Sequence, residues 1–347
     1  MLGVNRDKIL LWLPSPVGDA VLCTPALRSI CRRFEGEDIY FLASGTVRRL
    51  LSPNNLGNEW VESNGGCLIP LIRRLRGCGF LRAVLFKNSF GSALTTFLAG
   101  VPERIGYARD GRTVLLTQRI RPPKGADGRF KPVSMIDYYL RIAAELGCET
   151  TERYTELSVD RRDKLSLSAK LGGVLSGRSP LVVLVPGGAF GPSKWWPADR
   201  FAATADRLIE KYDATVVICV APDKTEARIA ERICGLAKRK VHSLADTPLA
   251  MGELKAFLAE SNLVITNDTG PRHIAIALGK KVITLFGPNN PKWTRTGYEQ
   301  EVQIKGQAEC VPCDKPRCRR NRHLCMESIG VDTVCAAAGE ILDNLRK

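Results

Sequence analysis

Three short segments of the chain combine small residues with polar side chains that can do chemistry. In one-letter code they read PVGD, PGGAFGPSKWWP and NDTGPRH, and they span residues 16–19, 186–197 and 267–273. Each follows an apolar run of strand length. Ligands of open parallel sheets bind at the loops that follow the strands, so these three segments are the candidates for a binding or catalytic site.

The first segment offers a carboxylate. Asp19 follows Gly18, whose backbone belongs to the candidate loop, in a stretch that is otherwise small or apolar. A carboxylate in such surroundings is a candidate general base for a hydroxyl nucleophile. The alternative is that Asp19 only compensates the positive N-terminal end of the helix that follows.

The third segment has the pattern of an anion-binding helix entrance. Gly270 precedes Pro271, which suits a helix start, and backbone N–H groups at such a start can bind a phosphate with the helix dipole behind them. Asp268 and Thr269 would contact a ligand there, or they would merely cap the helix.

Further donor-site candidates come from charged or polar residues near these loops. Lys194 could supply a point charge to phosphates, and His273 could bond a phosphate or fill the helix face. Glu226, early in an expected helix, could accept hydrogen bonds from a ribose or be simply solvated. Gly187 and Gly188 would let the backbone of their loop approach a ligand.

Four of the twelve cysteines need separate treatment. They lie in a Pro- and Arg-rich stretch with spacings of two, four and six residues, at Cys310, Cys313, Cys318 and Cys325. Four thiols could form a structural zinc site, but the spacing matches no common zinc finger, so free thiols or a labile disulfide remain alternatives. The densest basic cluster of the chain is interleaved with them and suits acidic headgroups, a phosphorylated acceptor or nucleic acid.

Several enzyme signatures are absent from the sequence. It contains no G-x-G-x-x-G, no G-x-x-x-x-G-K-[ST], no G-x-S-x-G and no H-E-x-x-H. The Asp-x-Asp pair typical of a divalent-metal nucleotide site is also missing. A group transfer that requires no metal or other cofactor is therefore expected.

The elements that must position these loops alternate between strand and helix. Expected strands are 8–13, 38–42, 83–86, 181–185, 215–220, 263–266 and 282–286, and expected helices include one that begins at Thr24 and Pro25, 135–146, 198–212, 225–236 and 332–345. Single helices between strands predict parallel sheets, and hence an α/β protein of two doubly wound, Rossmann-like domains that face a central cleft. The expected division is 1–171, a linker at 172–180, 181–328, and a terminal helix in 329–347 that packs back across the boundary.

Length and composition exclude other classes. The 347 residues suggest two domains, and with 44% hydrophobic and 25% charged residues the chain has enough apolar surface for packed cores. No apolar run is long enough to span a membrane, and an early run is interrupted too soon for a signal peptide, so a cytoplasmic protein is expected. The net charge of +15 favours anionic partners.

The three loops together resemble those of glycosyltransferase family 9, the ADP-heptose:lipopolysaccharide heptosyltransferases. The matching residues include Gly18-Asp19 with Thr24-Pro25, Ser193-Lys194 with Trp196-Pro197, Asn267 to Pro271 with His273, Phe286-Gly287-Pro288, Asn88-Ser89-Phe90 and Arg104 to Tyr107. The resemblance covers essentially the whole chain, and its middle segment is most similar to the second heptosyltransferase of the inner core.

The resemblance implies a GT-B fold and an inverting, metal-independent transfer of heptose from ADP-heptose to a lipopolysaccharide core or lipid A-linked acceptor. The N-terminal domain would bind the acceptor and the C-terminal domain the nucleotide sugar, with peripheral contact to the inner face of the inner membrane. Asp19 would be the base, and Lys194, Glu226, Asp268, Thr269, Gly270 and His273 would contact the donor.

Alternatives to this function stay open at the level of the sequence. The chain departs from the family pattern at Trp195, where an Arg is frequent, and at Arg272, which would add charge beside the diphosphate. A family member with another nucleotide sugar or acceptor is therefore an alternative, and a nucleic-acid-binding protein that uses the basic tail is a rival of a different class.

Overall fold

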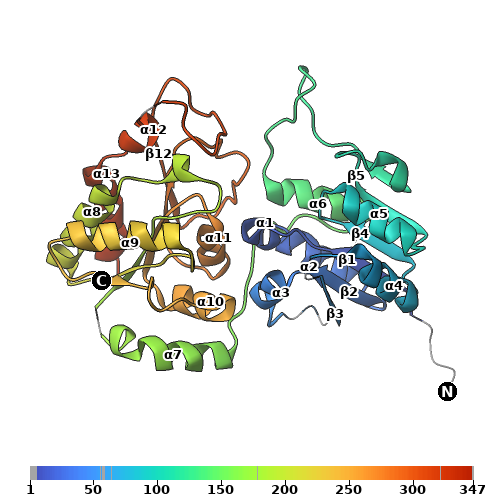
Figure 1. The fold of residues 1–347 in the computed structure, drawn as a ribbon, viewed down its shortest axis with the longest axis horizontal. Coiled ribbons are helices and arrows are strands. Elements are labelled where there is room, and N and C mark those ends of the chain that lie inside the picture. The colour runs from blue at the N-terminus through green and yellow to red at the C-terminus, as the bar shows by residue number, and fades with distance from the viewer. Residues whose placement is uncertain are drawn as a thin grey trace. The chain divides into compact units, whose positions relative to one another are not determined.

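The structure is a computed structural model, and it describes residues 6–54, 56, 59–63, 65–177, 179–320 and 322–345. By its contacts the chain forms two compact units (Figure 1). Unit 1 comprises Met1–Glu156 and Lys292–Thr296, and unit 2 comprises Leu157–Pro291 and Gly297–Lys347.

Unit 1 contains a sheet of six parallel strands. These are β1 (Lys8–Trp12), β2 (Asp38–Ala43), β3 (Glu59–Glu62), β4 (Arg82–Leu85), β5 (Glu103–Tyr107) and β6 (Gln118–Ile120). They lie in the order β3-β2-β1-β4-β5-β6. The chain order reverses between β1 and β4, so this is the point where a doubly wound sheet opens a binding crevice. The segment that carries Asp19, at the start of α1, follows β1 there.

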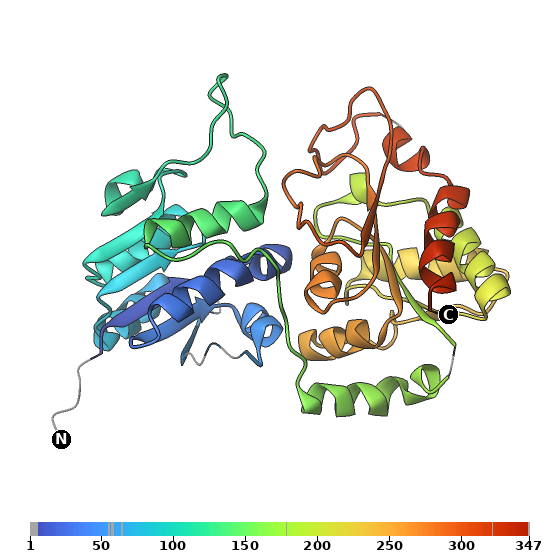
Figure 2. The same ribbon diagram turned by 180° about the vertical axis from the view of Figure 1, so that it is seen from behind.

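Helices cover both faces of this sheet. They are α1 (Val17–Leu22), α2 (Thr24–Arg33), α3 (Gly45–Leu51), α4 (Leu68–Cys78), α5 (Phe90–Leu98) and α6 (Met135–Glu145), with a 3-10 turn, η1 (Thr113–Leu115). Helices α4 and α5 pack side by side on one face, and α2 packs against α6 on the other (Figures 1 and 2). This is the layering expected when crossovers change face at the switch point.

Unit 2 repeats the architecture with its own six-stranded parallel sheet. The strands are β7 (Leu181–Val185), β8 (Thr215–Ile218), β9 (His242–Ser243), β10 (Leu263–Asn267), β11 (Val282–Phe286) and β12 (Glu301–Lys305). Their order is β12-β11-β10-β7-β8-β9, and the switch point lies between β7 and β10. The two remaining candidate loops follow these two strands, so the topology brings them together.

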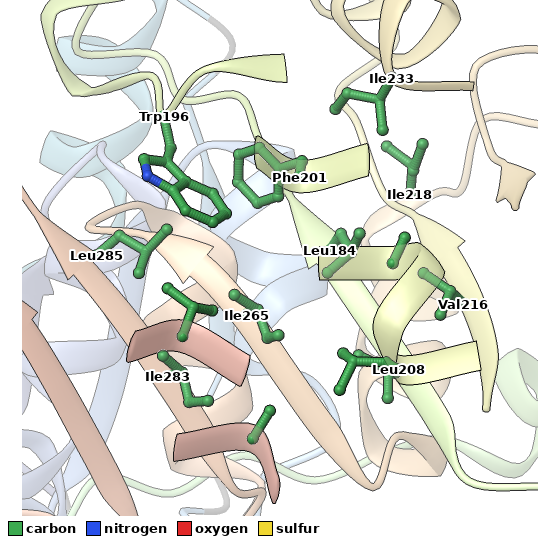
Figure 3. Close-up of a cluster of buried hydrophobic side chains, with 14 of the residues drawn as sticks. Leu184, Trp196, Phe201, Leu208, Val216, Ile218, Ile233, Ile265, Ile283 and Leu285 are labelled. Atoms are coloured by element: carbon green, nitrogen blue, oxygen red, sulfur yellow. The ribbon is translucent and has the colours of Figure 1, made fainter. Parts of the chain in front are cut away.

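The helices of unit 2 are α7 (Arg161–Leu175), α8 (Ala198–Tyr212), α9 (Lys224–Leu236), α10 (Met251–Glu260), α11 (Gly270–Ala277), α12 (Leu324–Glu327) and α13 (Val331–Asp343), with a 3-10 turn, η2 (Pro192–Lys194). A large buried cluster joins the sheet to α8, α9 and α13 (Figure 3). Trp196 packs edge-on against Phe201 in this cluster, and its indole N–H donates to the Ile329 carbonyl at 3.0 Å. Trp196 thereby fixes the end of the loop that carries Lys194.

The predicted α/β class with two doubly wound sheets is confirmed, but the division of the chain differs from the expected one. Helix α7 packs against α10 of unit 2, so the boundary falls after Glu156 and not at 172–180. The terminal helix α13 packs on α8 and on strands of unit 2, whereas it is the short segment Lys292–Thr296 that joins unit 1. There the Met135 N–H donates to the Trp293 carbonyl at 2.9 Å. Within the described residues no helix is both long and apolar enough to cross a membrane.

Candidate functional site

Asp19 lies in the first turn of α1, where the sequence predicted a loop. Pro16 precedes the helix in an extended conformation, and Gly18 and Asp19 follow it directly. The side chain of Asp19 is half-buried and lies near Tyr139 of α6. Burial raises the pKa of Asp19 to about 6, and the neighbouring Tyr139 hydroxyl opposes this shift. A pKa close to neutrality is expected of a general base. It is not expected of a carboxylate that only compensates a helix dipole.

In unit 2, Lys194 and Asp268 form a buried ion pair. The Lys194 ammonium donates to the carboxylate of Asp268 at 3.1 Å and to the Asp268 backbone carbonyl at 2.8 Å. It also lies 4.6 Å from the centre of the Phe190 ring. This contact places Lys194 beside the turn formed by Asp268, Thr269 and Gly270, at the start of α11.

Arg272 completes the charge network from the first turn of α11. Its guanidinium is fully buried and binds Asp268 at 2.9 Å and Glu301 of β12 at 2.6 Å. Burial alone would raise the pKa of Asp268, but the positive charges of Arg272 and Lys194 lower it to about 2. The sequence suggested that Arg272 adds charge beside a diphosphate; in the structure its guanidinium is paired with Asp268, which it shares with Lys194, and with Glu301.

The entrance of α11 has no side-chain cap. Thr269 is the N-cap residue in an extended conformation, and its side chain makes no capping hydrogen bond. The Thr269 hydroxyl instead lies 3.3 Å from that of Thr266, and the Asp268 carboxylate is engaged by Lys194 and Arg272. The alternative that Asp268 and Thr269 merely cap the helix is therefore wrong. Backbone N–H groups of the first turn are left for an anion.

His273 is buried next to this network in its neutral form. Burial and then the charge of Arg272 lower the pKa of His273 to about 3, and its Nε2 lies 3.9 Å from Asp268. Among the described residues, its Nδ1 has no hydrogen-bond partner, and the same is true of Trp195 Nε1 and Asn267 Oδ1. These three atoms belong to the loop after β7, the end of β10 and the first turn of α11. Buried polar atoms without partners are the condition in which a bound ligand is expected to supply them.

Glu226 braces two loops instead of being solvated. It lies in the first turn of α9, and its carboxylate accepts the N–H of Gly188 at 2.9 Å and of Ala221 at 2.7 Å. A Cβ on Gly187 would lie 2.2 Å from the Glu226 carboxyl carbon, and one on Gly188 would lie 2.6 Å from the Thr269 methyl group. Both glycines are therefore required by close approach.

This close approach gives a stability prediction. Gly187→Ala is expected to destabilise the protein by about 1–3 kcal/mol, because the new methyl group overlaps Glu226. Thermal unfolding measures the effect. Gly235→Ala in α9 is the control, since a Cβ there meets nothing within 4 Å, and it should stabilise slightly. Equal behaviour of the two variants would contradict the packing argument.

The cysteine stretch supports the Lys194 loop. Its other three thiols lie near enough to Cys325 to contribute to the raised pKa of that thiol, after the larger effect of burial. In the described part of the chain, no three His, Cys, Asp or Glu side chains are grouped so that they could hold a metal ion. Cys325 is buried on α12, Cys310 is exposed, and all four cysteines are free thiols. Ser193, next to Lys194, donates its hydroxyl to the Lys315 carbonyl at 2.6 Å, so this stretch buttresses the loop.

Sequence reasoning missed two partners of the predicted residues, Tyr139 and Glu301. Tyr139 lies 120 residues after Asp19, and Glu301 lies in a strand that the sequence pattern did not reveal. Their contacts with Asp19 and Arg272 depend on which strands and helices become neighbours. Tyr139 is a polar residue on the buried face of α6, and this is the one local signal that could have pointed to it.

Comparisons with known proteins agree with this geometry. A sequence model of glycosyltransferase family 9 (heptosyltransferase) matches residues 68–323. Lipopolysaccharide heptosyltransferase 2 of Escherichia coli K12 is 29% identical over 305 residues, which cover 83% of this chain and 84% of that protein.

Solved structures show the same fold. The E. coli ADP-heptose lipopolysaccharide heptosyltransferase II superposes with a TM-score of 0.81 at 24% identity, covering 98% of this chain and 100% of that one. E. coli heptosyltransferase WaaC with ADP-2-deoxy-2-fluoro heptose superposes with a TM-score of 0.69 at 14% identity, covering 96% and 99%. The architecture is the GT-B fold.

Proposed function

The chain belongs to glycosyltransferase family 9, and from that premise we propose that it transfers heptose from ADP-heptose to an acceptor in the inner core of lipopolysaccharide. The uncapped entrance of α11, with the Lys194 ammonium bound to its Asp268, is the observation that carries the proposal. A positive side chain and free backbone N–H groups at one turn suit a diphosphate leaving group. The names of its relatives support the sugar and the acceptor.

In the proposed reaction, unit 1 supplies the base and unit 2 holds the donor. The Asp19 carboxylate takes the proton of an acceptor hydroxyl while that oxygen attacks the anomeric carbon of the donor. The bond from this carbon to the diphosphate breaks, its electron pair stays on the departing ADP, and Asp19 leaves the step protonated. A single displacement of this kind inverts the anomeric configuration and needs no metal ion, since Lys194 and the α11 N–H groups stabilise the leaving charge.

The other donor contacts are assigned by position. Thr269 and Gly270 form the turn at the diphosphate, and neutral His273 offers a ring N–H or a lone pair to a bound phosphate. Glu226 braces the Gly187-Gly188 loop and keeps lone pairs for a ribose hydroxyl. Asp268 acts through Lys194, because its own carboxylate is already fully paired.

A panel of nucleotide sugars and truncated core acceptors tests the proposal, with products read by mass. We expect product with ADP-heptose and an inner-core acceptor. Product with another nucleotide sugar alone would instead identify a family member of different specificity. ADP should also raise the unfolding temperature, whereas salt-sensitive binding of an oligonucleotide without an ADP effect would favour the nucleic-acid-binding alternative.

Lys194→Ala is expected to weaken ADP binding on the order of a hundredfold, because it removes the cation at the diphosphate. Arg272 still pairs with Asp268 in this variant, so the fold should survive. Isothermal titration with ADP measures the loss. Lys240→Ala, an exposed lysine before β9, is the control and should leave the affinity unchanged. An unaltered affinity of the Lys194 variant would remove this residue from the donor site.

A further inference from the structure

Helix α5 is amphipathic in the reverse of the usual sense. Its hydroxyl residues Ser92, Thr95 and Thr96 are completely buried, while Phe90 and Phe97 are each 48% exposed and Leu98 is 42% exposed. A helix on a soluble domain normally turns its large apolar side chains toward the core. The solvent side of α5 therefore consists of large apolar groups.

The buried hydroxyl groups are compatible with burial because most of them donate hydrogen bonds to backbone carbonyls of the same segment. Ser92 donates to the Lys87 carbonyl at 2.9 Å, and Thr96 donates to the Ser92 carbonyl at 3.1 Å. These small side chains let α5 lie close to the sheet. The outer side of α5 leaves Phe90, Phe97 and Leu98 partly exposed, and large apolar side chains exposed together point to something that covers them.

Helix α4 extends the same surface with arginines. Ile69, Arg73 and Arg76 follow at a spacing of four and then three residues and share one side of α4, and Ile69 is 56% exposed. The Arg76 guanidinium donates to the Leu98 carbonyl at 2.6 Å, which joins this side of α4 to the end of α5 (Figure 1). We call this surface the α4–α5 face: Leu68, Ile69, Arg73, Arg76, Phe90, Phe97 and Leu98.

The charge on the α4–α5 face has one sign. Helices α4 and α5 contain no acidic residue, and Arg73 is exposed. Arg104 of the neighbouring β5 places its guanidinium 5.3 Å from the Phe97 ring. Exposed Phe and Leu side chains among arginines are the combination that inserts into the headgroup region of a membrane with anionic lipids.

We propose that the α4–α5 face docks unit 1 on an anionic lipid surface. The proposal rests on the proposed function, because a lipopolysaccharide acceptor is held in a membrane. The N-terminal ends of α4 and α5, with Leu68, Ile69 and Phe90, follow β3 and β4 at the carboxyl edge of the parallel sheet. The C-terminal ends of the two helices, with Arg76, Phe97 and Leu98, lie toward the opposite edge, so the α4–α5 face spans unit 1 from one edge of the sheet to the other.

Cosedimentation of the full chain with vesicles tests the docking. The wild type should bind vesicles of phosphatidylethanolamine with phosphatidylglycerol and bind vesicles of phosphatidylcholine far less. The double variant Phe97→Gln with Leu98→Gln should lose about tenfold or more in partition, and Arg73→Glu should lose at least roughly fivefold. The matched controls are Leu165→Gln and Lys164→Glu on α7, which are also exposed and should bind like the wild type.

The remaining outcomes are equally informative. Vesicle binding that survives the α4–α5 variants but is lost in Arg317→Ser with Arg319→Ser would move the membrane contact to the cysteine stretch and overturn the proposal. A wild-type dimer in sedimentation velocity that Phe97→Gln dissociates, without vesicle binding, would assign the face to a second copy of the chain. ADP affinity and transfer to a delipidated, water-soluble acceptor are measured in parallel, so that failure of docking and failure of the proposed transferase activity are distinguished.

Discussion

Asp19→Asn is expected to lower kcat by about a thousandfold while the affinity for ADP stays within twofold of the wild type, because general bases contribute about 10²–10⁴-fold and the donor contacts lie in unit 2. The amide keeps the size of the side chain but cannot take a proton. Single-turnover transfer assays and ADP titration measure the two quantities. Asp7→Asn, at the other end of β1, is the control and should be fully active.

The pH dependence gives an independent check on the same residue. Since burial raises the pKa of Asp19 to about 6 in the free protein, kcat/KM of the wild type should rise with pH through about 6 and then level off. The pKa of Asp19 in the folded protein, about 6, lies above the ordinary value of 3.8. Ionisation of Asp19 therefore makes the fold less stable as the pH increases from 3.8 to about 6. Asp19→Asn should therefore be at least as stable as the wild type at pH 7. An inactive variant that is also unfolded, or an active one, would count against the assignment of Asp19 as the base.

Arg272→Met should destabilise the protein by about 3–5 kcal/mol at pH 7. In this variant the buried carboxylate of Asp268 keeps one cation, Lys194, whereas the buried carboxylate of Glu301 loses its ion-pair partner. Denaturant unfolding measures the loss. Addition of Glu301→Gln should recover part of it, since one uncompensated charge is removed. Arg320→Met is the control, because its ion pair with Glu309 is exposed, and it should change stability by no more than about 0.5 kcal/mol.

The network also predicts how acid acts on unit 2. The pKa of Asp268 is lowered to about 2 in the folded state from an ordinary value of 3.8, so its contribution to stability is present above pH 3.8 and disappears as the pH falls through about 2. In Arg272→Met the same decrease in pH protonates carboxylates that have lost a cation, so the difference in stability between the variant and the wild type should shrink. A difference that grows in acid would contradict the assigned pairing.

The local pattern of the sequence predicted much of the fold. Strands 181–185 and 282–286 and helix 198–212 begin and end where expected, because an uninterrupted apolar run or a 3.6-residue period is visible within a few residues. The start of α2 was predicted less well. The Thr24-Pro25 pair suggests Thr24 as the N-cap, but the N-cap is Cys23, and the Thr24 hydroxyl donates backward to the Val21 carbonyl at 2.8 Å, because α1 precedes α2 without a loop.

The α/β class and the three loops that carry the candidate chemistry could be predicted from residue types at short spacings, and so could the proposal of Asp19 as base and Lys194 as cation. The pairing of Arg272 with Asp268 and Glu301, the approach of Tyr139 to Asp19 and the place of α7 in unit 2 could not. The reason is physical: sheet order is not chain order, and burial and charge pairing are set by neighbours that lie tens of residues away.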